Sequence, residues 1–295
     1  MGRFFDILSS MGIAALLYLF MGIIRLVIRI LFKIVFAVLL IAFITIAVVC
    51  TIISLKTPRL DRNWEDDSKL LPSITISTST VSVNNIRDWR YEKDKVVSSR
   101  YYNDTFDLKK IDKAYLLFNP FGAWEGVGHS FLVFTFTDGK SISVSIEARR
   151  EKGEVYEAIK KGLFNEYEVW YAFGSVEDFT SRRAIYNNED LYEYPLLISI
   201  STAQAVFLDL ARTAHSLETT PDFYNTVTSN CTNLLADSAN RVNPGSIPWS
   251  FARLFTGYAD NQLYDLGLIP HDKPFEEIYK EARIDEGIRA HPPAR

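Results

Sequence analysis

Cys231 is the residue of this sequence with the clearest capacity for covalent chemistry. It follows a polar, strand-like run and begins an expected helix over residues 231–242. A thiol in the first turn of a helix lies close to unpaired N–H groups and to the positive end of the helix dipole, which favour the nucleophilic thiolate. Polar residues flank Cys231 on both sides, and this favours a nucleophile over the alternative, a small buried hydrophobic residue.

His129 offers a base for that thiol. It follows the Gly-Val-Gly sequence of residues 126–128 and opens an expected strand over residues 129–137. Asp138-Gly139 then separates this run from a second alternating run, residues 140–149, and such a dipeptide between two alternating runs predicts a β-hairpin. Together, Cys231 and His129 suggest a Cys–His nucleophilic site.

Glu147 is the expected third member of the site. If the hairpin loop comprises residues 138–140, Arg149 lies opposite His129 and Glu147 is its diagonal neighbour on the same face. A two-residue loop would instead send Glu147 to the opposite face. On the first register Glu147 orients and charges His129, and the alternative is an ordinary salt bridge between Glu147 and Arg149.

Residues near the cysteine and the histidine are candidates for binding substrate. Asn225, Asn230 and the N–H groups around Cys231 could form an oxyanion hole, because acyl transfer concentrates charge on a carbonyl oxygen. An asparagine at a helix cap is also ordinary. The set of expected substrate-binding residues is completed by Tyr224, Arg149 and Trp124. Trp124, with Phe118 and Phe121, lies in or beside a Gly-rich aromatic loop and is expected to line an acyl-chain pocket, to enter a lipid interface, or to pack in the core.

Other chemistries lack their signatures. The four histidines are too scattered for a zinc site, and neither a G-x-S-x-G elbow nor a Walker loop occurs. No metal and no cofactor are therefore expected. Net charge is −4 and no basic stripe follows the apolar N-terminal segment, so nucleic acid is not an expected partner. Two cysteines, with Cys50 inside the apolar segment, do not make a disulfide framework.

Residues 1–55 are predicted to be a membrane anchor. Residues 34–55 form an uncharged apolar stretch long enough to cross a hydrocarbon core, and residues 7–24 are also apolar. Arg25, Arg29 and Lys33 lie between the two stretches. A helical hairpin with a basic tip is slightly favoured over one span preceded by an interfacial helix. Basic residues occur on both sides of the final span, so charge does not assign its orientation.

The remainder of the chain is predicted to form an α+β domain. Residues 56–84 are expected to be a linker and a first strand, residues 85–284 the folded domain, and residues 285–295 a disordered tail. Further strands are expected at 113–118 and 167–173, and helices at 154–161, 201–217 and 231–242. Ser201 or Thr202 is the expected N-cap of the second helix, and Ser229 or Asn230 that of the third.

Several stretches of the sequence, taken in order, resemble one family. They are residues 100–108 (Arg-Tyr-Tyr-Asn-Asp-Thr-Phe-Asp-Leu), 128–132 (Gly-His-Ser-Phe-Leu), 143–149 (Ser-Val-Ser-Ile-Glu-Ala-Arg), 223–226 (Phe-Tyr-Asn-Thr) and 230–232 (Asn-Cys-Thr). This ordered set is similar to the N-terminal periplasmic domain of the bacterial lipoprotein N-acyltransferase Lnb. The likeness runs from Trp64 to Ile284, which is nearly all of the chain after the anchor.

The resemblance implies a permuted papain-like fold of the NlpC type, in which the histidine precedes the cysteine, as in lecithin:retinol acyltransferase relatives. It implies Cys231 as nucleophile, His129 as base and Glu147 as orienting group. It also implies a periplasmic domain held at the bacterial inner membrane, which transfers an acyl chain from a phospholipid, through a thioester, to a lipoprotein N-terminus or another amine. In the family's acyltransferases the membrane helices follow this domain, whereas here they precede it. The catalytic pair is therefore better supported than the lipoprotein acceptor.

Three functions stay open from the sequence. The first is a membrane-anchored thiol acyltransferase or lipid deacylase, and the second is an NlpC-type cysteine amidase or peptidase acting on cell-wall peptides. The third is a non-catalytic envelope module, because a fold does not by itself require a reactive thiol. An apolar tunnel beside Cys231 would favour the first, an open polar groove the second, and a cysteine out of reach of His129 the third.

Overall fold

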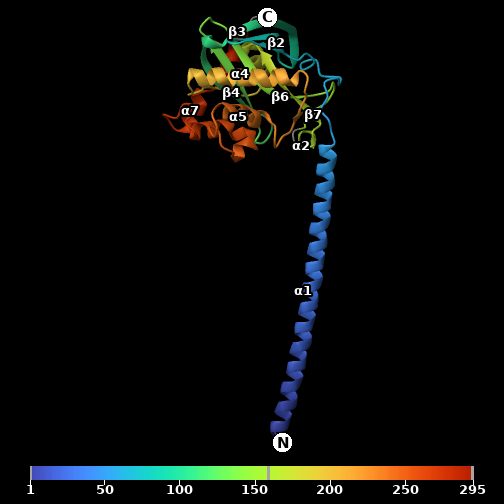
Figure 1. Ribbon diagram of the computed structural model, residues 1–295. Coiled ribbons are helices and arrows are strands. Elements are labelled where there is room, and N and C mark those ends of the chain that lie inside the picture. The colour runs from blue at the N-terminus through green and yellow to red at the C-terminus, as the bar shows by residue number, and fades with distance from the viewer. Residues whose placement is uncertain (1, 158–159, 294–295) are drawn as a thin grey trace. The chain divides into compact units, whose positions relative to one another are not determined.

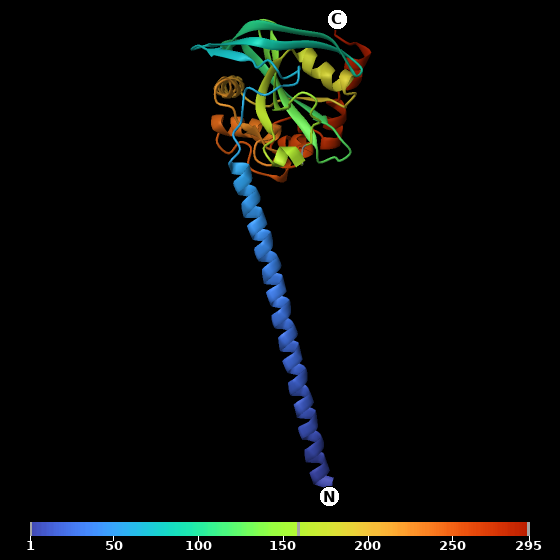
Figure 2. The same cartoon turned by 90° about the vertical axis from the view of Figure 1, so that its right-hand side faces the viewer.

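The computed structural model describes residues 2–157 and 160–293, with side chains from residue 18 onward. The chain divides into two compact units, residues 1–57 and residues 58–295 (Figures 1 and 2). Each is described by itself.

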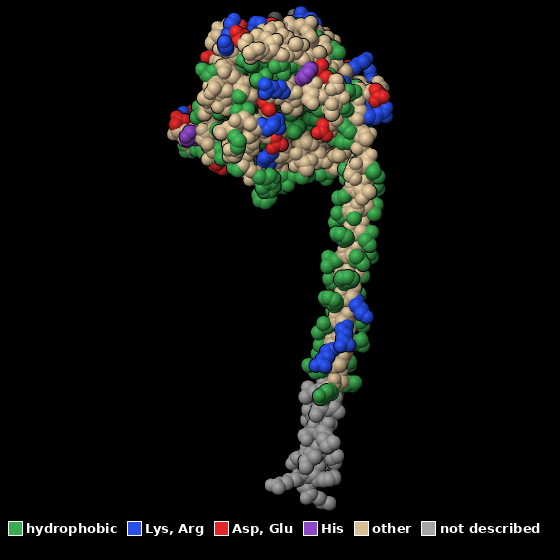
Figure 3. Space-filling model, viewed as in Figure 1, with side chains coloured by type: hydrophobic (Ala, Val, Ile, Leu, Met, Phe, Trp, Pro, Cys, Tyr) green, Lys and Arg blue, Asp and Glu red, His purple; other side chains and the backbone are tan. Residues whose placement is uncertain are grey.

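The first unit is a single helix, α1 (Gly2–Ser54). Its described portion Tyr18–Ser54 is long and apolar enough to cross a membrane. Figure 3 shows hydrophobic side chains along it, interrupted by one group of basic side chains. The predicted helical hairpin is wrong, because Arg25, Arg29 and Lys33 continue the helix. Arginine and lysine are good helix formers, and no proline precedes Pro58 to break the helix.

The second unit is built on a mixed sheet of nine strands in the described residues. Seven of them follow the spatial order β1-β2-β7-β6-β5-β4-β8, while β3 pairs with β2 and β9 pairs with β7. All pairs are antiparallel except β2 with β7. The strands are β1 (Ser73–Ile76), β2 (Thr80–Glu92), β3 (Lys95–Asp107), β4 (Ile111–Pro120), β5 (Gly128–Phe136), β6 (Ser141–Arg149), β7 (Tyr167–Gly174), β8 (Tyr192–Pro195) and β9 (Phe223–Tyr224).

Helices cover both faces of the sheet (Figure 1). The larger apolar core lies under α4 and α5 and includes Phe134, Phe207 and Cys231. The smaller core lies on the opposite face, where Phe179 of α3 packs with Phe131 and Trp170. The helices are α2 (Lys160–Leu163), α3 (Val176–Ser181), α4 (Ile200–Leu217), α5 (Cys231–Val242), α6 (Ala259–Asp265), α7 (Phe275–Glu281) and α8 (Asp285–Ala290), with a π-helical turn η2 (Arg182–Tyr186) and short 3-10 turns η1 (Leu108–Lys110), η3 (Phe251–Arg253) and η4 (Thr256–Tyr258).

Most predicted elements are present, and two predictions are wrong. Helix α5 has the predicted bounds, and α4 begins one residue earlier than predicted because Ser199 caps it. The helix predicted at 154–161 is reduced to α2, with residues 158–159 outside the described part. Residues 285–290 of the tail predicted to be disordered form α8, because Asp285 is buried and bonds Arg283 and Arg289, and residues 294–295 lie outside the described part.

The connection between β5 and β6 comprises residues 137–139. Phe136 N–H donates to Lys140 O at 2.9 Å, and Gly139 N–H donates to Phe136 O at 3.0 Å. Gly139 has φ +85°, so this is a three-residue loop that ends on a left-handed glycine, one of the common hairpin connections.

This loop shifts the hairpin register by two residues from the predicted one. Phe131 faces Ser145, and the same register continued along the strands places Glu147 across from His129, where Arg149 was predicted. The predicted sharing of one face by His129, Glu147 and Arg149 is kept, because a shift of two preserves the alternation of side chains.

Candidate active site

Cys231 is the first residue of α5, as the sequence predicts. Asn230 caps the helix: its Oδ1 accepts a hydrogen bond from the N–H of Asn233 at 2.8 Å. The thiol exposes 2% of its surface and belongs to the larger core, while its position keeps it beside the unpaired N–H groups of the first helical turn.

His129 lies near the start of β5 and is held by groups on β6. Its Nε2 lies 2.8 Å from Ser145 Oγ and 3.2 Å from Glu147 Oε1. Ser145 Oγ in turn donates to Glu147 Oε1 at 2.8 Å. The three side chains come from facing positions of one hairpin, so their spacing is fixed by the β ladder.

The histidine and the cysteine influence each other's ionisation. The imidazole of His129 lowers the pKa of the Cys231 thiol and the thiolate raises the pKa of His129, while the backbone N–H of Ser130 also lowers the pKa of the thiol. Since Nε2 is engaged by Ser145 and Glu147, Nδ1 is the ring nitrogen available to the thiol. The hydroxyl of Thr232 lies 3.9 Å from the sulfur. Glu147 and His129 are thus in direct contact, and Cys231 is coupled to His129 electrostatically.

Electrostatics favour a thiolate–imidazolium pair. Burial lowers the pKa of His129, but the Glu147 carboxylate and the Cys231 thiolate outweigh burial and raise it to about 9. Burial raises the pKa of Cys231, but the His129 imidazolium and the Ser130 N–H outweigh it, so that the pKa falls below its ordinary value. The imidazole is therefore protonated at neutral pH, and its charge favours ionisation of the thiol.

Arg183 is a member of the site that the sequence reasoning missed. It projects from the π-helical turn η2, and its guanidinium donates to Glu147 Oε1 at 2.7 Å. The pKa of Glu147 is held well below its usual range, because the attraction of His129 and Arg183 overcomes the effect of burial. The Arg182-Arg183 dipeptide is the sequence signal for this partner, but nothing in its spacing places it beside β6.

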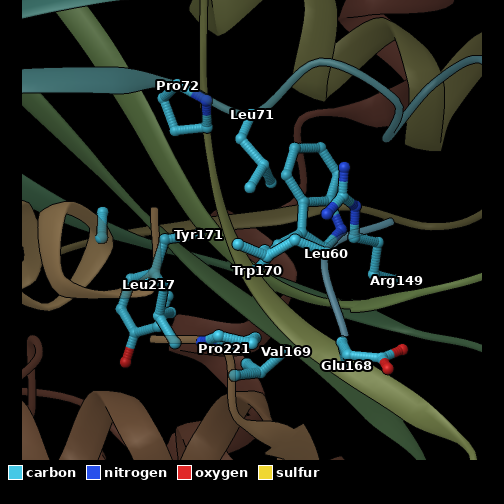
Figure 4. A pocket seen from close by; sticks show the side chains of 11 residues that line it. Leu60, Leu71, Pro72, Arg149, Glu168, Val169, Trp170, Tyr171, Leu217 and Pro221 are labelled. Atoms are coloured by element: carbon cyan, nitrogen blue, oxygen red, sulfur yellow. The ribbon is translucent and has the colours of Figure 1, made fainter. Parts of the chain in front are cut away.

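Arg149 does not take part in this cluster. Its Nε and NH2 groups donate to the carbonyls of Ser68 and Lys69 at 2.9 and 3.0 Å, and its guanidinium stacks on Trp64. It lines a crevice (Figure 4) with ten other residues: Leu60, Leu71, Pro72, Glu168, Val169, Trp170, Tyr171, Ala214, Leu217 and Pro221. Neither His129 nor Cys231 lines this crevice, so the contacts of Arg149 are structural and lie outside the candidate site.

The side-chain amides of Asn225 and Asn230 donate hydrogen bonds to other groups of the protein. Asn230 Nδ2 donates to the carbonyls of Thr226 and Arg253 at 2.8 and 2.9 Å. Asn225 Nδ2 donates to Leu163 O and to Asn165 Oδ1. Both amide groups already have acceptors, so neither is free to serve a developing oxyanion.

Tyr224 lies near the thiol and has a partner that was not anticipated. Burial, together with the Tyr156 phenol and the Cys231 thiolate, raises the pKa of Tyr224 well above the ordinary value. Burial also raises the pKa of Tyr156 to about 12. Both phenols therefore stay protonated at neutral pH and are able to donate hydrogen bonds near the sulfur.

The predicted aromatic loop divides between core and surface. Phe118 is buried in the larger core, Phe121 is half-buried, and Trp124 is 52% exposed. Among the described residues, no group of three or more His, Cys, Asp or Glu side chains could hold a metal ion. The arrangement is suited to nucleophilic attack by sulfur with proton transfer by an imidazole.

Fold and site together define an α+β domain that carries a buried histidine and a buried cysteine beside a half-buried glutamate and follows a helix able to cross a membrane. Residues 98–257, more than half of the chain, match the Lnb N-terminal periplasmic domain. The chain belongs to this family. The match covers the histidine, the glutamate and the cysteine, and it lies within the broader resemblance seen in the sequence. No curated protein and no solved structure was found to match the chain. Family and helix together indicate an Lnb-like, membrane-anchored protein with a periplasmic domain.

Proposed function

We propose that this protein is a membrane-anchored thiol acyltransferase or lipid deacylase that uses Cys231 as its nucleophile. The observation that carries the proposal is the contact of Glu147 with His129, together with the mutual pKa shifts of His129 and a thiol at the start of α5. Perturbed pKa values of this kind are common at catalytic sites. The non-catalytic alternative predicted a cysteine out of reach of His129, and the electrostatic coupling of the two side chains argues against it.

The proposed reaction has two acyl transfers. The Cys231 thiolate attacks the ester carbonyl of a phospholipid, forming a carbon–sulfur bond, while the ester C–O bond breaks and the departing alkoxide takes the proton of His129. The N–H groups of Cys231 and Ser130 stabilise the oxyanion formed on the way. In the second step neutral His129 removes a proton from an amine or from water, which attacks the thioester and releases the thiolate.

The chain order supports a permuted papain-like architecture for this domain. The cysteine begins a helix that packs on an antiparallel sheet, and that sheet supplies the histidine and its carboxylate. The histidine comes first in the chain, as it does in the family that the sequence resembles. A periplasmic domain at the inner membrane would have phospholipid within reach, which favours a lipid ester over a cell-wall peptide as the acyl donor.

The test is incubation of the purified full chain with radiolabelled phosphatidylethanolamine. We expect a protein adduct that hydroxylamine removes, as it does a thioester, and that is absent from Cys231→Ser and His129→Ala. Ser238→Ala, which alters a buried serine farther along the same helix, is the matched control and keeps the adduct. Absence of an adduct from the wild type, with peptides released from added peptidoglycan, would refute the lipid donor and identify an amidase.

A further inference from the structure

Four aromatic side chains form a continuous, partly exposed group, here called the aromatic rim: Trp124, Trp249, Phe251 and Phe255. The Trp249 and Phe251 rings lie 5.7 Å apart, Phe251 and Phe255 6.4 Å apart, and Phe255 and Trp124 5.2 Å apart. Trp249 and Phe251 are each 68% exposed. Figure 3 shows hydrophobic side chains protruding from the surface of the domain. Such large aromatic exposure is costly in water unless another surface covers it.

One side of the rim is bonded to the chain that leads into His129. Thr256 Oγ1 donates to Gly128 O at 2.6 Å, and Gly257 N–H donates to Gly126 O at 3.1 Å. The two segments pack so closely that a Cβ atom on Gly257 would overlap the carbonyl of Glu125. The rim is therefore joined to the residues immediately before the histidine.

The other side of the rim is bonded to the start of α5. The carbonyl of Arg253 accepts from Asn230, the residue before Cys231, and its guanidinium donates to Asn233 Oδ1 at 2.9 Å and to Asp237. Phe251 and Arg253 belong to the same 3-10 turn. The rim thus spans the two segments that present the imidazole and the thiol.

The segments that carry the rim offer little charge. Residues 119–128 contain one charged side chain, Glu125, and residues 243–258 contain one, Arg253. Arg253 is bonded within the domain, and Glu125 accepts from the Tyr258 hydroxyl at 2.9 Å. A partner attracted by charge is therefore not favoured. Tryptophan and phenylalanine are the side chains that favour the interface between water and lipid.

The chain itself keeps the domain close to lipid. Helix α1 ends at Ser54, and the backbone N–H of Arg59 already bonds Glu168 within the domain at 3.0 Å. Four residues separate these points, and the five extended steps from Ser54 to Arg59 span at most about 18 Å. A bilayer crossed by α1 is thus the surface that the domain meets at the highest effective concentration.

We propose that the aromatic rim is a docking surface that inserts into the headgroup region of a phospholipid bilayer and brings the Cys231 site to the lipid. The catalytic role of this docking rests on the proposed function, whereas the docking itself does not. Cys231 and His129 expose 2% and 7% of their surfaces, so a lipid ester reaches the sulfur only when a flanking segment moves. Insertion of the rim would displace the segments that flank both residues.

Brominated lipid tests insertion directly, because bromine on an acyl chain quenches tryptophan only at short range. The sequence has five tryptophans, of which Trp64, Trp89 and Trp170 are buried at 5 to 6% exposure, and none lies in α1. The full chain is reconstituted in phosphatidylcholine vesicles with and without brominated chains. We expect quenching of part of the wild-type emission, a smaller quenched part in Trp249→Phe and in Trp124→Phe, and loss of most of it in the double variant.

The inference is overturned if the double variant is quenched as strongly as the wild type, or if the wild type is not quenched at all. Emission that responds to protein concentration instead of to brominated lipid would identify a second copy of the chain as the occupant. The measurement is repeated in Cys231→Ala, where quenching is expected to persist. Failure of the proposed chemistry and failure of the docking are then distinguishable.

A second arm asks whether docking serves the site. Trp249→Ser combined with Phe251→Ser is expected to lose most of the adduct formation from vesicle phospholipid and to keep it with short-chain lipid dispersed below its micelle concentration. The control replaces Leu197 and Ile200, which are 50% and 53% exposed and are not members of the rim, with serine, and is expected to match the wild type. Equal loss in both double variants would contradict a specific role for the rim.

Discussion

Replacing Glu147 with glutamine separates the charge of the carboxylate from its shape. The glutamine Oε1 can still accept hydrogen bonds from Ser145 and Arg183, as Glu147 Oε1 does. What is lost is the negative charge 3.2 Å from His129 Nε2. The variant therefore tests whether Glu147 keeps the imidazole protonated or only holds it in place.

The magnitude follows from the pKa of His129. It is raised from 6.5 to about 9, a net gain that corresponds to about 3 kcal/mol in favour of the imidazolium. Without Glu147 the largest attraction to the imidazolium is lost, while burial and Arg183 still act against it, so the pKa of His129 falls toward its ordinary value. If it reaches 6.5, the protonated fraction of His129 at pH 8 drops from roughly 90% to roughly 3%. The population of Cys231 thiolate that is stabilised by the imidazolium then falls about thirtyfold.

The assay is the rate of iodoacetamide alkylation of Cys231 between pH 5 and pH 10. It is carried out on the full chain in a Cys50→Ser background, because Cys50 is the other cysteine of the sequence. Cys231 is buried, but glutamine and glutamate have the same size, so access to the sulfur is the same in both proteins. We expect Glu147→Gln to lose most of the reactivity near pH 8 and to recover it at higher pH, where the thiol ionises by itself.

Two results would refute this reasoning. An alkylation profile unchanged in Glu147→Gln would mean that the carboxylate does not charge the histidine. A profile changed equally in Glu193→Gln, which alters a half-buried carboxylate on β8, would mean that the effect is not specific to the site.

Three further predictions concern other charged groups. Arg183→Met removes a cation that lowers the pKa of His129, so His129 should lose its proton, and the alkylation rate of Cys231 should change, at a pH above 9. This shift is opposite to the one expected for Glu147→Gln. An unchanged pH would exclude Arg183 from the site. Asp178→Ala leaves the buried guanidinium of Arg87 without its carboxylate and should cost about 3–5 kcal/mol in urea unfolding of the domain; a cost under about 1 kcal/mol would contradict the buried pair. Burial raises the pKa of Asp260 from 3.8 to about 6, so the folded state binds this proton more tightly and loses stability as pH rises through that range. Asp260→Asn should therefore stabilise the fold by up to about 3 kcal/mol at pH 8 and by nothing near pH 4, as measured by thermal unfolding, and a gain equal at both pH values would contradict it.

The sequence was sufficient where local signals determine structure. An Asn followed by Cys and a periodic apolar stripe set the bounds of α5, and Asp-Gly between two alternating runs marked the β5–β6 hairpin. The alternation of side chains along the two paired strands correctly placed His129 and Glu147 on one face of the hairpin. Its absolute register was wrong by two residues, because it depends on which of several loop geometries the glycine adopts.

The rest of the site depends on contacts between distant segments. Arg183 reaches Glu147 from a π-helical turn 36 residues farther along the chain, and no periodicity in the sequence encodes that approach. The predicted helical hairpin in the anchor failed for a different reason. Three basic residues were taken as a polar tip, although the local backbone preference of arginine and lysine favours continuing the helix.

The two neighbouring arginines of η2 also connect the site to the beginning of the domain. Arg183 bonds Glu147, while Arg182 donates to Asp67 Oδ2 at 2.6 Å, and the Asp67 carbonyl accepts from Arg87 at 3.2 Å. Residues 59–69 are thus part of the charged framework behind the imidazole and not a dispensable spacer. A soluble fragment cut just after α1 would keep this framework intact, whereas one trimmed to Ser73, where the first strand begins, would lose the carboxylate of Asp67 and leave Arg182 to compete with Arg183 for Glu147.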